Sequence, residues 1–155
     1  MKSNCLVFCL LWAVLLLQAC SDTAQSPEDE IRQFVESAVE AAENRDLDDL
    51  SDLIHAKYVD QKGYEKKQLE GLLRAYFFRH KDLYLFTKIE EIDLYAEDQA
   101  TVLLYVAMAG SVISDIDAMA ALRARIYRFE LQLAREDDWL LQRASWRPAS
   151  AVEIE

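Results

Sequence analysis

The sequence predicts an α+β domain in which three helices precede an antiparallel sheet. Residues 26–80 carry apolar side chains at the three- and four-residue spacing of amphipathic helices. Residues 83–147 are rich in β-forming residues, and short polar turns divide them into two hairpins. The chain has 155 residues and is 52% hydrophobic, which is enough for one domain with a buried core.

The helical region is predicted to begin at Ser26-Pro27, because serine caps helices and proline is favoured in their first turn. An apolar stripe continues to about Glu43, and Asp46 starts a short second helix. These two helices contain Ile31, Phe34, Val35, Ala38, Ala41, Ala42, Leu47, Leu50, Leu53 and Ile54. A turn at residues 60–63 leads to a third helix from about Glu65 to His80. Its predicted buried face consists of Leu69, Leu72, Leu73, Tyr76 and Phe77.

The sheet region follows as two predicted hairpins with turns at residues 97–99 and 134–138. The predicted strands are Leu83–Tyr95, Ala100–Ala109, Leu122–Leu133 and Trp139–Arg147. The connection between the hairpins, Ser111–Ala120, is unusually apolar for a loop. Two interpretations of it stay open: a lid or interaction loop, or a packed turn or short helix.

The N-terminus has the pattern of an export signal. Lys2 precedes an apolar run, Cys5–Leu17, which is too short to span a bilayer. The run ends in Leu17-Gln18-Ala19-Cys20, which resembles the lipobox of bacterial lipoproteins. The resemblance implies that residues 1–19 are removed and that Cys20 carries lipid. Ser21 in place of aspartate then implies the outer membrane of the cell envelope, facing the periplasm.

The remaining chain is expected to form one domain on a lipidated tether. Residues 20–27 are short and polar, residues 28–150 form the domain, and residues 151–155 form a C-terminal tail. The net charge of −11 argues against nucleic-acid binding, since phosphate contacts need a basic surface. The sequence has no Gly-rich phosphate loop, zinc-type spacing or nucleophile elbow, so no cofactor and no metal are expected.

The layout of residues 28–147 resembles the nuclear transport factor 2-like superfamily, which includes ketosteroid isomerase and SnoaL-type proteins. The resemblance rests on Ala41–Asp46 before a Leu-rich helix, the Gly63 turn, Asp98–Val102, and a closing strand with Trp139 and Trp146. It implies a cone in which the helices pack on a curved, mostly antiparallel sheet around a pocket. The alternative is a cystatin-like domain or another helix-on-sheet sandwich.

The resemblance also implies where catalysis would occur, because enzymes of this superfamily place a carboxylate base in the pocket. Asp60 lies near that position and is the catalytic candidate. The alternative is a turn aspartate that accepts backbone N–H groups. The first helix has Phe34 where a tyrosine donor is wanted. Neither His55 nor His80 has a partner acid set by spacing. The sequence therefore favours a domain that is not an enzyme.

Five arginines near the last hairpin stand out in an acidic chain: Arg123, Arg125, Arg128, Arg143 and Arg147. If Leu133 faces Trp139, Arg125 lies opposite Arg147, a pairing of like charges that favours an anion between them. The same pairing sets Tyr127 opposite Ser145 and Phe129 opposite Arg143. The candidate ligand-binding residues are Arg123, Arg125, Tyr127, Arg143, Trp146 and Arg147. The alternative is that nearby acids pair with these arginines, or that their stems cover apolar surface.

Three functions are consistent with these features. The first is a lipid-anchored periplasmic protein whose domain binds a small apolar or anionic ligand or an envelope protein. The second is an isomerase- or dehydratase-type enzyme that uses a pocket carboxylate. The third is a structural subunit that uses the outer sheet face to form a homodimer or to dock in an envelope complex.

Overall fold

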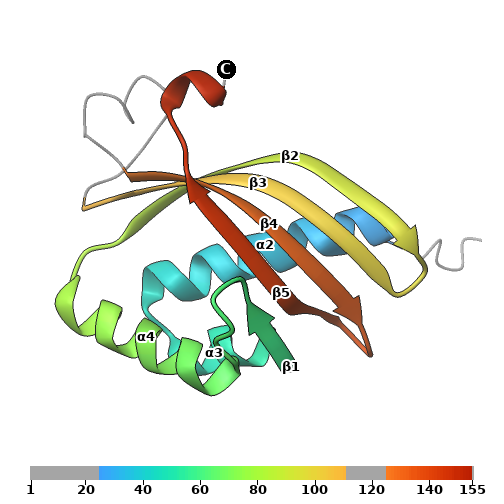
Figure 1. The fold of residues 1–155 in the computed structure, drawn as a ribbon, viewed down its shortest axis with the longest axis horizontal. Coiled ribbons are helices and arrows are strands. Elements are labelled where there is room, and N and C mark those ends of the chain that lie inside the picture. Colours follow the sequence, from blue (N-terminus) through green and yellow to red (C-terminus); the bar gives the residue numbers. More distant parts are fainter. Residues whose placement is uncertain (1–24, 111–124, 155) are drawn as a thin grey trace, which may run out of the picture.

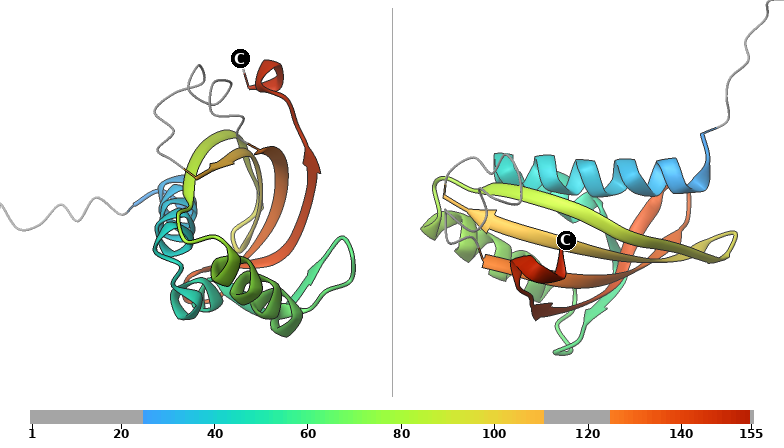
Figure 2. Two further views of the ribbon diagram at one scale, coloured as in Figure 1. Left: turned by 90° about the vertical axis from the view of Figure 1, so that its left-hand side faces the viewer. Right: turned by 90° about the horizontal axis from the view of Figure 1, so that it is seen from above.

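A single curved sheet of five strands organises the domain, and the computed structural model describes it over residues 25–110 and 125–154 (Figures 1 and 2). The helices are α2 (Pro27–Asn44), α3 (Leu47–Asp52) and α4 (Lys66–Arg79). The strands are β1 (Ile54–Asp60), β2 (Tyr84–Ala96), β3 (Gln99–Ala109), β4 (Arg125–Arg135) and β5 (Trp139–Pro148). The sheet order is β1-β5-β4-β3-β2, with only β1 parallel to its neighbour. The predicted α+β class is confirmed.

The two predicted helix starts are confirmed by their caps. The backbone N–H of Asp29 donates to the Ser26 hydroxyl at 3.2 Å, and Pro27 occupies the first turn of α2. The backbone N–H groups of Asp48 and Asp49 each donate to Asp46 Oδ1 at 3.1 Å. Local hydrogen bonds of this kind depend on a few adjacent residues, which is why they can be predicted from sequence.

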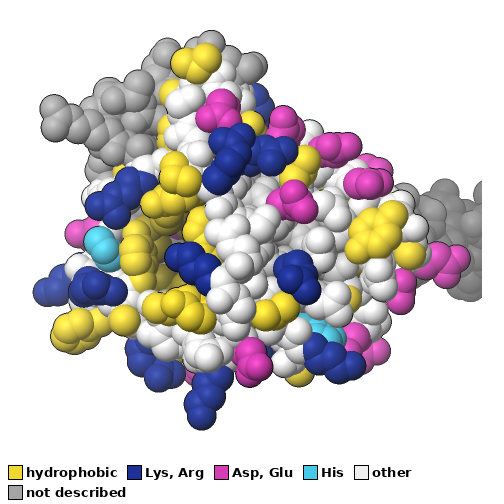
Figure 3. All heavy atoms as spheres, viewed as in Figure 1, with side chains coloured by type: hydrophobic (Ala, Val, Ile, Leu, Met, Phe, Trp, Pro, Cys, Tyr) yellow, Lys and Arg dark blue, Asp and Glu magenta, His cyan; other side chains and the backbone are white. Residues whose placement is uncertain are grey.

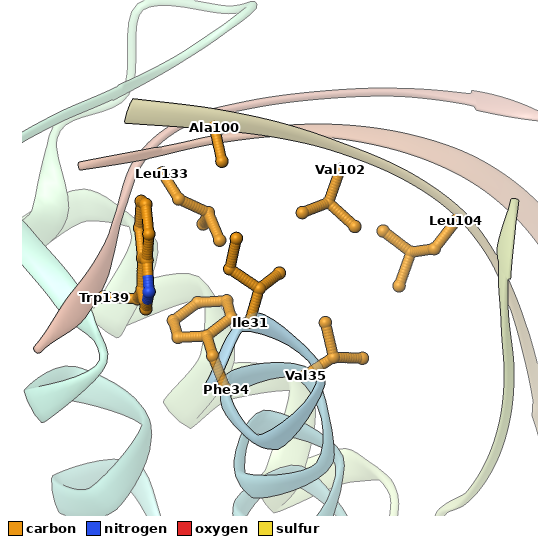
Figure 4. Close-up of a cluster of buried hydrophobic side chains, with 8 residues drawn as sticks. All are labelled: Ile31, Phe34, Val35, Ala100, Val102, Leu104, Leu133 and Trp139. Carbon is orange, nitrogen blue, oxygen red and sulfur yellow. The ribbon is translucent and has the colours of Figure 1, made fainter. Parts of the chain in front are cut away.

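The main core lies between α2 and the sheet (Figure 4). Ile31, Phe34 and Val35 of α2 pack against side chains of β3, β4 and β5. The sheet side of this core consists of Ala100, Val102, Leu104, Leu133 and Trp139. The predicted apolar stripe of the first helix is thus its buried face.

The region between α3 and α4 differs from the prediction. Ile54 does not continue the second helix but begins β1, a strand that the sequence did not predict. This strand pairs with β5 through an irregular register, so it has no clean apolar alternation to reveal it. Leu72, expected on the buried face of α4, is exposed, whereas Leu69 and Leu73 are half-buried.

The assumed pairing of the last two strands is wrong. Trp139 pairs with Arg135 rather than Leu133, so the turn contains only residues 136–138. A bulge at Gln132/Leu133 shifts the register further, and Arg147 therefore lies opposite Arg128. The length of a hairpin turn and the position of a bulge set the register, and neither is evident in this sequence.

The segment after β5 packs against the domain. Residues Ala151–Glu153 form the short 3-10 helix η1, and the next residue, Ile154, is 1% exposed. Figure 2 shows η1 outside the curve of the sheet, on the face opposite α2. The predicted signal, Cys20 and the Ser111–Ala120 connection lie outside the described residues. Among the helices that are described, none is long and apolar enough to cross a membrane.

Candidate functional site

Helix α2 packs against one part of the concave sheet face. Ala100, Val102 and Leu104 of β3 face α2, and alternation carries the same face onward to Val106 and Met108. On the neighbouring β4, Phe129 pairs with Leu104 and Tyr127 pairs with Val106. The concave face therefore becomes aromatic where it extends beyond the α2 core.

Three half-buried aromatic side chains, Tyr127, Phe129 and Trp146, lie on this part of the face, and the half-buried Tyr76 of α4 reaches Met108 beside them. We call the region around these four side chains the aromatic hollow. The rings of Phe129 and Trp146 are stacked with centroids 6.1 Å apart, and those of Tyr127 and Phe129 are 6.4 Å apart. The Tyr76 hydroxyl lies 3.9 Å from Met108 Sδ, which brings α4 across to β3. Figure 3 shows hydrophobic side chains gathered between α4 and the adjoining strand ends.

A cleft of about 210 Å³ opens at the edge of the hollow. Tyr76 and Met108 line it together with His80, Asp82 and Arg125. The His80 ring lies against Tyr76 with centroids 4.2 Å apart, and Arg125 pairs with Met108 across the β3–β4 ladder. The cleft at the edge of the hollow, which we call its mouth, is thus lined by side chains of both charge signs.

Strand β1 contributes a buried polar pair beside the hollow. Tyr58 packs against Ala144 and Trp146, and Asp60, two residues further on, is 3% exposed. Asp60 Oδ1 accepts the N–H groups of Lys62 at 2.7 Å and Tyr64 at 2.9 Å. Its buried Oδ2 has no hydrogen-bond donor among the described residues. Burial, and to a lesser degree the charge of Asp60, raise the pKa of Tyr58 to about 12.

Solved structures with a similar chain path identify the fold. No protein-family model matches the chain, and no curated protein sequence matches it either. An NTF2-like protein of unknown function from Shewanella oneidensis superposes with a TM-score of 0.57 at 19% identity, covering 78% of this chain and 98% of that one. The fold is NTF2-like.

Two further structures with this NTF2-like arrangement carry different names. A candidate scytalone dehydratase from Novosphingobium aromaticivorans has a TM-score of 0.67 and 14% identity, with 84% of this chain and 89% of that chain covered. Bd1075 from Bdellovibrio bacteriovorus has a TM-score of 0.63 and 16% identity over 77% of this chain. The match spans 41% of the Bd1075 chain. At these identities the likeness shows the fold alone.

The two histidines of the NTF2-like domain have separate environments. His55 is buried, and its Nε2 lies 3.1 Å from Glu136 Oε1 while its Nδ1 accepts the Lys57 N–H at 2.9 Å. His80 lies at the mouth of the hollow instead. No group of three or more His, Cys, Asp or Glu side chains in residues 25–110 and 125–154 is arranged to hold a metal ion.

The residues predicted to bind a ligand are divided between the two faces of the NTF2-like sheet. Tyr127 and Trp146 lie in the aromatic hollow, and Arg125 lies at its mouth. Arg143 and Arg147 lie on the opposite face, because neighbouring residues of a strand point to opposite sides. Arg123 lies outside the described residues.

Tyr58 was missed as a site residue because its strand was missed. Once residues 54–60 are recognised as a strand, the alternation of Tyr58 and Asp60 places both side chains on one face. For Asp60, the structure shows the hydrogen bonds of the turn interpretation, and the catalytic interpretation stays a prediction. It is a turn aspartate that accepts two backbone N–H groups, and it is also a buried carboxylate beside the hollow.

Proposed function

We propose that this NTF2-like domain binds a small apolar ligand in the aromatic hollow. The observation that carries the proposal is the set of half-buried aromatic rings that continues the concave face beyond α2. Aromatic surface gains about 1.5–3 kcal/mol per side chain when it is fully removed from water, which a bound ligand can supply. A rigid sheet with two stacked rings is also preorganised for a flat molecule.

The mouth of the hollow indicates the polarity of one end of this ligand. Arg125 and His80 line the mouth together with the carboxylate of Asp82, and Arg125 is the one guanidinium among the residues that line it. A guanidinium group binds carboxylates and similar anions through paired N–H donors. We therefore expect a flat, apolar body with one anionic group.

Replacing Tyr76 with alanine should weaken ligand binding about tenfold, because it removes one wall of the hollow and the contact with Met108. The measurement is a calorimetric titration with naphthoate, a flat apolar ring that carries one carboxylate. Circular dichroism of the variant checks that the fold is retained.

The matched control for this experiment is Phe78→Ala on the same helix. Phe78 is 87% exposed, so its removal should leave naphthoate binding unchanged. Equal losses in the two variants, or no binding by the wild-type protein, would rule out the hollow as the naphthoate site.

The second candidate function is an isomerase- or dehydratase-type enzyme with Asp60 as the base. The buried Oδ2, without a described donor, favours it, since a carboxylate kept unpaired is available to accept a proton. In this alternative, a ligand with an acidic C–H beside a carbonyl would be turned over in the hollow. The Asp60→Asn variant would bind it without turnover.

We further propose that the domain is held at a membrane by lipid on Cys20. The support is the sequence Leu17-Gln18-Ala19-Cys20 after an apolar run. Two or more acyl chains are needed for stable anchoring, and the short polar residues 21–26 then serve as the tether. The proposed location is the outer membrane, facing the periplasm.

Bacterial cells expressing the chain should incorporate a palmitate analogue into it, and Cys20→Ala should abolish this incorporation. Cys9→Ala is the matched control, because Cys9 belongs to the segment that is removed, and labelling should be unchanged. Labelling that persists in Cys20→Ala would refute the anchor while leaving the ligand site untouched.

A further inference from the structure

The sheet face opposite α2 carries a row of cationic side chains. Lys88 pairs with Tyr105, Tyr105 with Arg128, and Arg128 with Arg147, so these four residues lie side by side across β2, β3, β4 and β5. Like charges on directly opposed residues are unfavourable unless an anion lies near them. Arg128, in the middle of the row, donates to Glu90 Oε2 at 3.3 Å, so Lys88 and Arg147 are the two cations of the row that need another acceptor.

The segment of residues 150–154 supplies acceptors to this row. Arg147 Nη2 donates to Glu153 Oε2 at 2.7 Å, and Lys88 Nζ donates to the Ile154 carbonyl. The hydrogen bond from Arg147, together with the Ser150 backbone N–H, lowers the pKa of Glu153. Figure 3 shows Lys and Arg side chains gathered beside η1. The segment thus binds the row through one carboxylate and one carbonyl.

Ile154 anchors the same segment in an apolar pocket. Its side chain is 1% exposed and packs against Tyr105 and Ala107, with Phe86 and Ile126 around them. Val152, in the middle of the segment, is 78% exposed. Two consecutive side chains, Glu153 and Ile154, therefore make the contact, as in a short peptide ligand with one charged and one apolar anchor.

The segment also has a conformation of its own. The Ser150 N–H donates to Glu153 Oε1 at 3.0 Å, and the Glu153 N–H donates to the Ser150 carbonyl at 3.1 Å. These bonds fold four residues into a turn that presents Glu153 and Ile154 together. A segment that is ordered by its own contacts pays less entropy when it binds.

We propose that this row and pocket form a recognition site for a short acidic segment of a partner protein, in which glutamate is followed by an aliphatic residue. Residues 150–154 occupy the site in cis and compete with the partner. Covalent tethering gives such a competitor an effective concentration of roughly millimolar. The partner must therefore bind the site more tightly than residues 150–154 do, or be present at a high local concentration of its own. The site lies on the opposite sheet face from the hollow, so it is independent of the proposed ligand site.

The test uses the full chain in detergent and a fluorescent peptide with the sequence of residues 149–155. Ile154→Asp places a charge in the apolar pocket and should release the segment. Anisotropy should then show that the peptide binds Ile154→Asp at least about tenfold more tightly than it binds the wild-type chain. If Ile154→Asp does not fold, Glu153→Arg replaces it, because a cation beside Arg147 also expels the segment.

Matched variants identify the residues that bind the peptide. Adding Arg147→Ala to the Ile154→Asp chain, which we call the released variant, should reduce its affinity for the peptide about tenfold. Arg143→Ala, on the same strand and face but without a contact to the segment among the described bonds, should not change it. A peptide in which glutamine replaces the glutamate before isoleucine should bind the released variant weakly. Its affinity should be as low as that of the original peptide for the released variant that also carries Arg147→Ala. Equal binding to wild-type and released chains, binding to neither, or no effect of Arg147→Ala would overturn the proposal.

Discussion

Replacing Trp139 with alanine should lower the free energy of unfolding by about 3–5 kcal/mol. The indole is buried against Ile31 and Phe34, so its removal leaves a large cavity between α2 and the sheet. Its Nε1–H also donates to Glu30 Oε2 at 3.0 Å, and Arg135 Nη2 lies 3.0 Å from the same carboxylate. This contact joins the first turn of α2 to the end of the β4–β5 hairpin.

Urea denaturation followed by circular dichroism gives the free energy of unfolding without relying on tryptophan fluorescence. Trp139→Phe is the matched control, because it keeps an aromatic ring and removes the N–H. We expect this control to cost about 1–3 kcal/mol, the range for a lost buried hydrogen bond to a charged group. A loss below about 1 kcal/mol in Trp139→Ala would show that the α2–sheet core does not depend on this ring.

Replacing Asp60 with asparagine should raise the free energy of unfolding by about 1–3 kcal/mol. Asparagine retains an oxygen for the N–H groups of Lys62 and Tyr64 and removes the negative charge from the buried Oδ2 position. A neutral amide costs less to bury than a carboxylate without a donor. The measurement is again urea denaturation, with Asp82→Asn at an exposed site as the control.

The same variant should lower the pKa of Tyr58 from about 12, because the nearby charge is removed while burial of the phenol remains. The raised pKa stabilises the folded state below pH 10.0, and this contribution is lost as the pH rises toward about 12. In the Asp60→Asn variant, this stabilising contribution of Tyr58 should be lost over a lower pH range than in the wild-type protein. Ultraviolet absorbance of the phenolate, with Tyr58→Phe subtracted, gives the titration.

The change in unfolding free energy of Asp60→Asn also distinguishes two roles of Asp60, a residue kept for chemistry and a residue kept for its turn hydrogen bonds. A gain in stability would mean that the chain keeps a destabilising carboxylate beside the aromatic hollow, as expected for a residue retained for chemistry. A loss in stability would mean that the turn hydrogen bonds of Asp60 dominate. That result would remove the support for the enzyme and leave the binding proposal in place.

The features that the sequence predicted well depend on near neighbours along the chain. Ser26 and Asp46 cap the helices they were predicted to cap, and the apolar stripe of residues 31–42 includes the face of α2 that is buried. Caps use hydrogen bonds over two or three residues, and the helical period repeats every 3.6 residues. Such signals are complete within a short window of sequence.

The features that were missed or misassigned depend on distant contacts. Strand β1 is held by parallel pairing with β5, about eighty-five positions later in the chain, and its side chains show no regular alternation. The predicted pairing of Arg125 with Arg147 is wrong, because a shorter turn and a bulge set a different register of β4 against β5. As a result Arg147 faces Glu153 and η1 rather than a ligand shared with Arg125.

The sequence by itself determined the α+β class, the helix starts, the two hairpins and the arginine-rich strands in an acidic chain. Only the tertiary structure decided which aromatic rings meet in the hollow, and that Arg125 and Arg147 belong to opposite faces of the sheet. The physical reason is that strand register is set by turn length, bulges and packing between distant segments. A shift of a single residue moves every side chain of a strand to the other face.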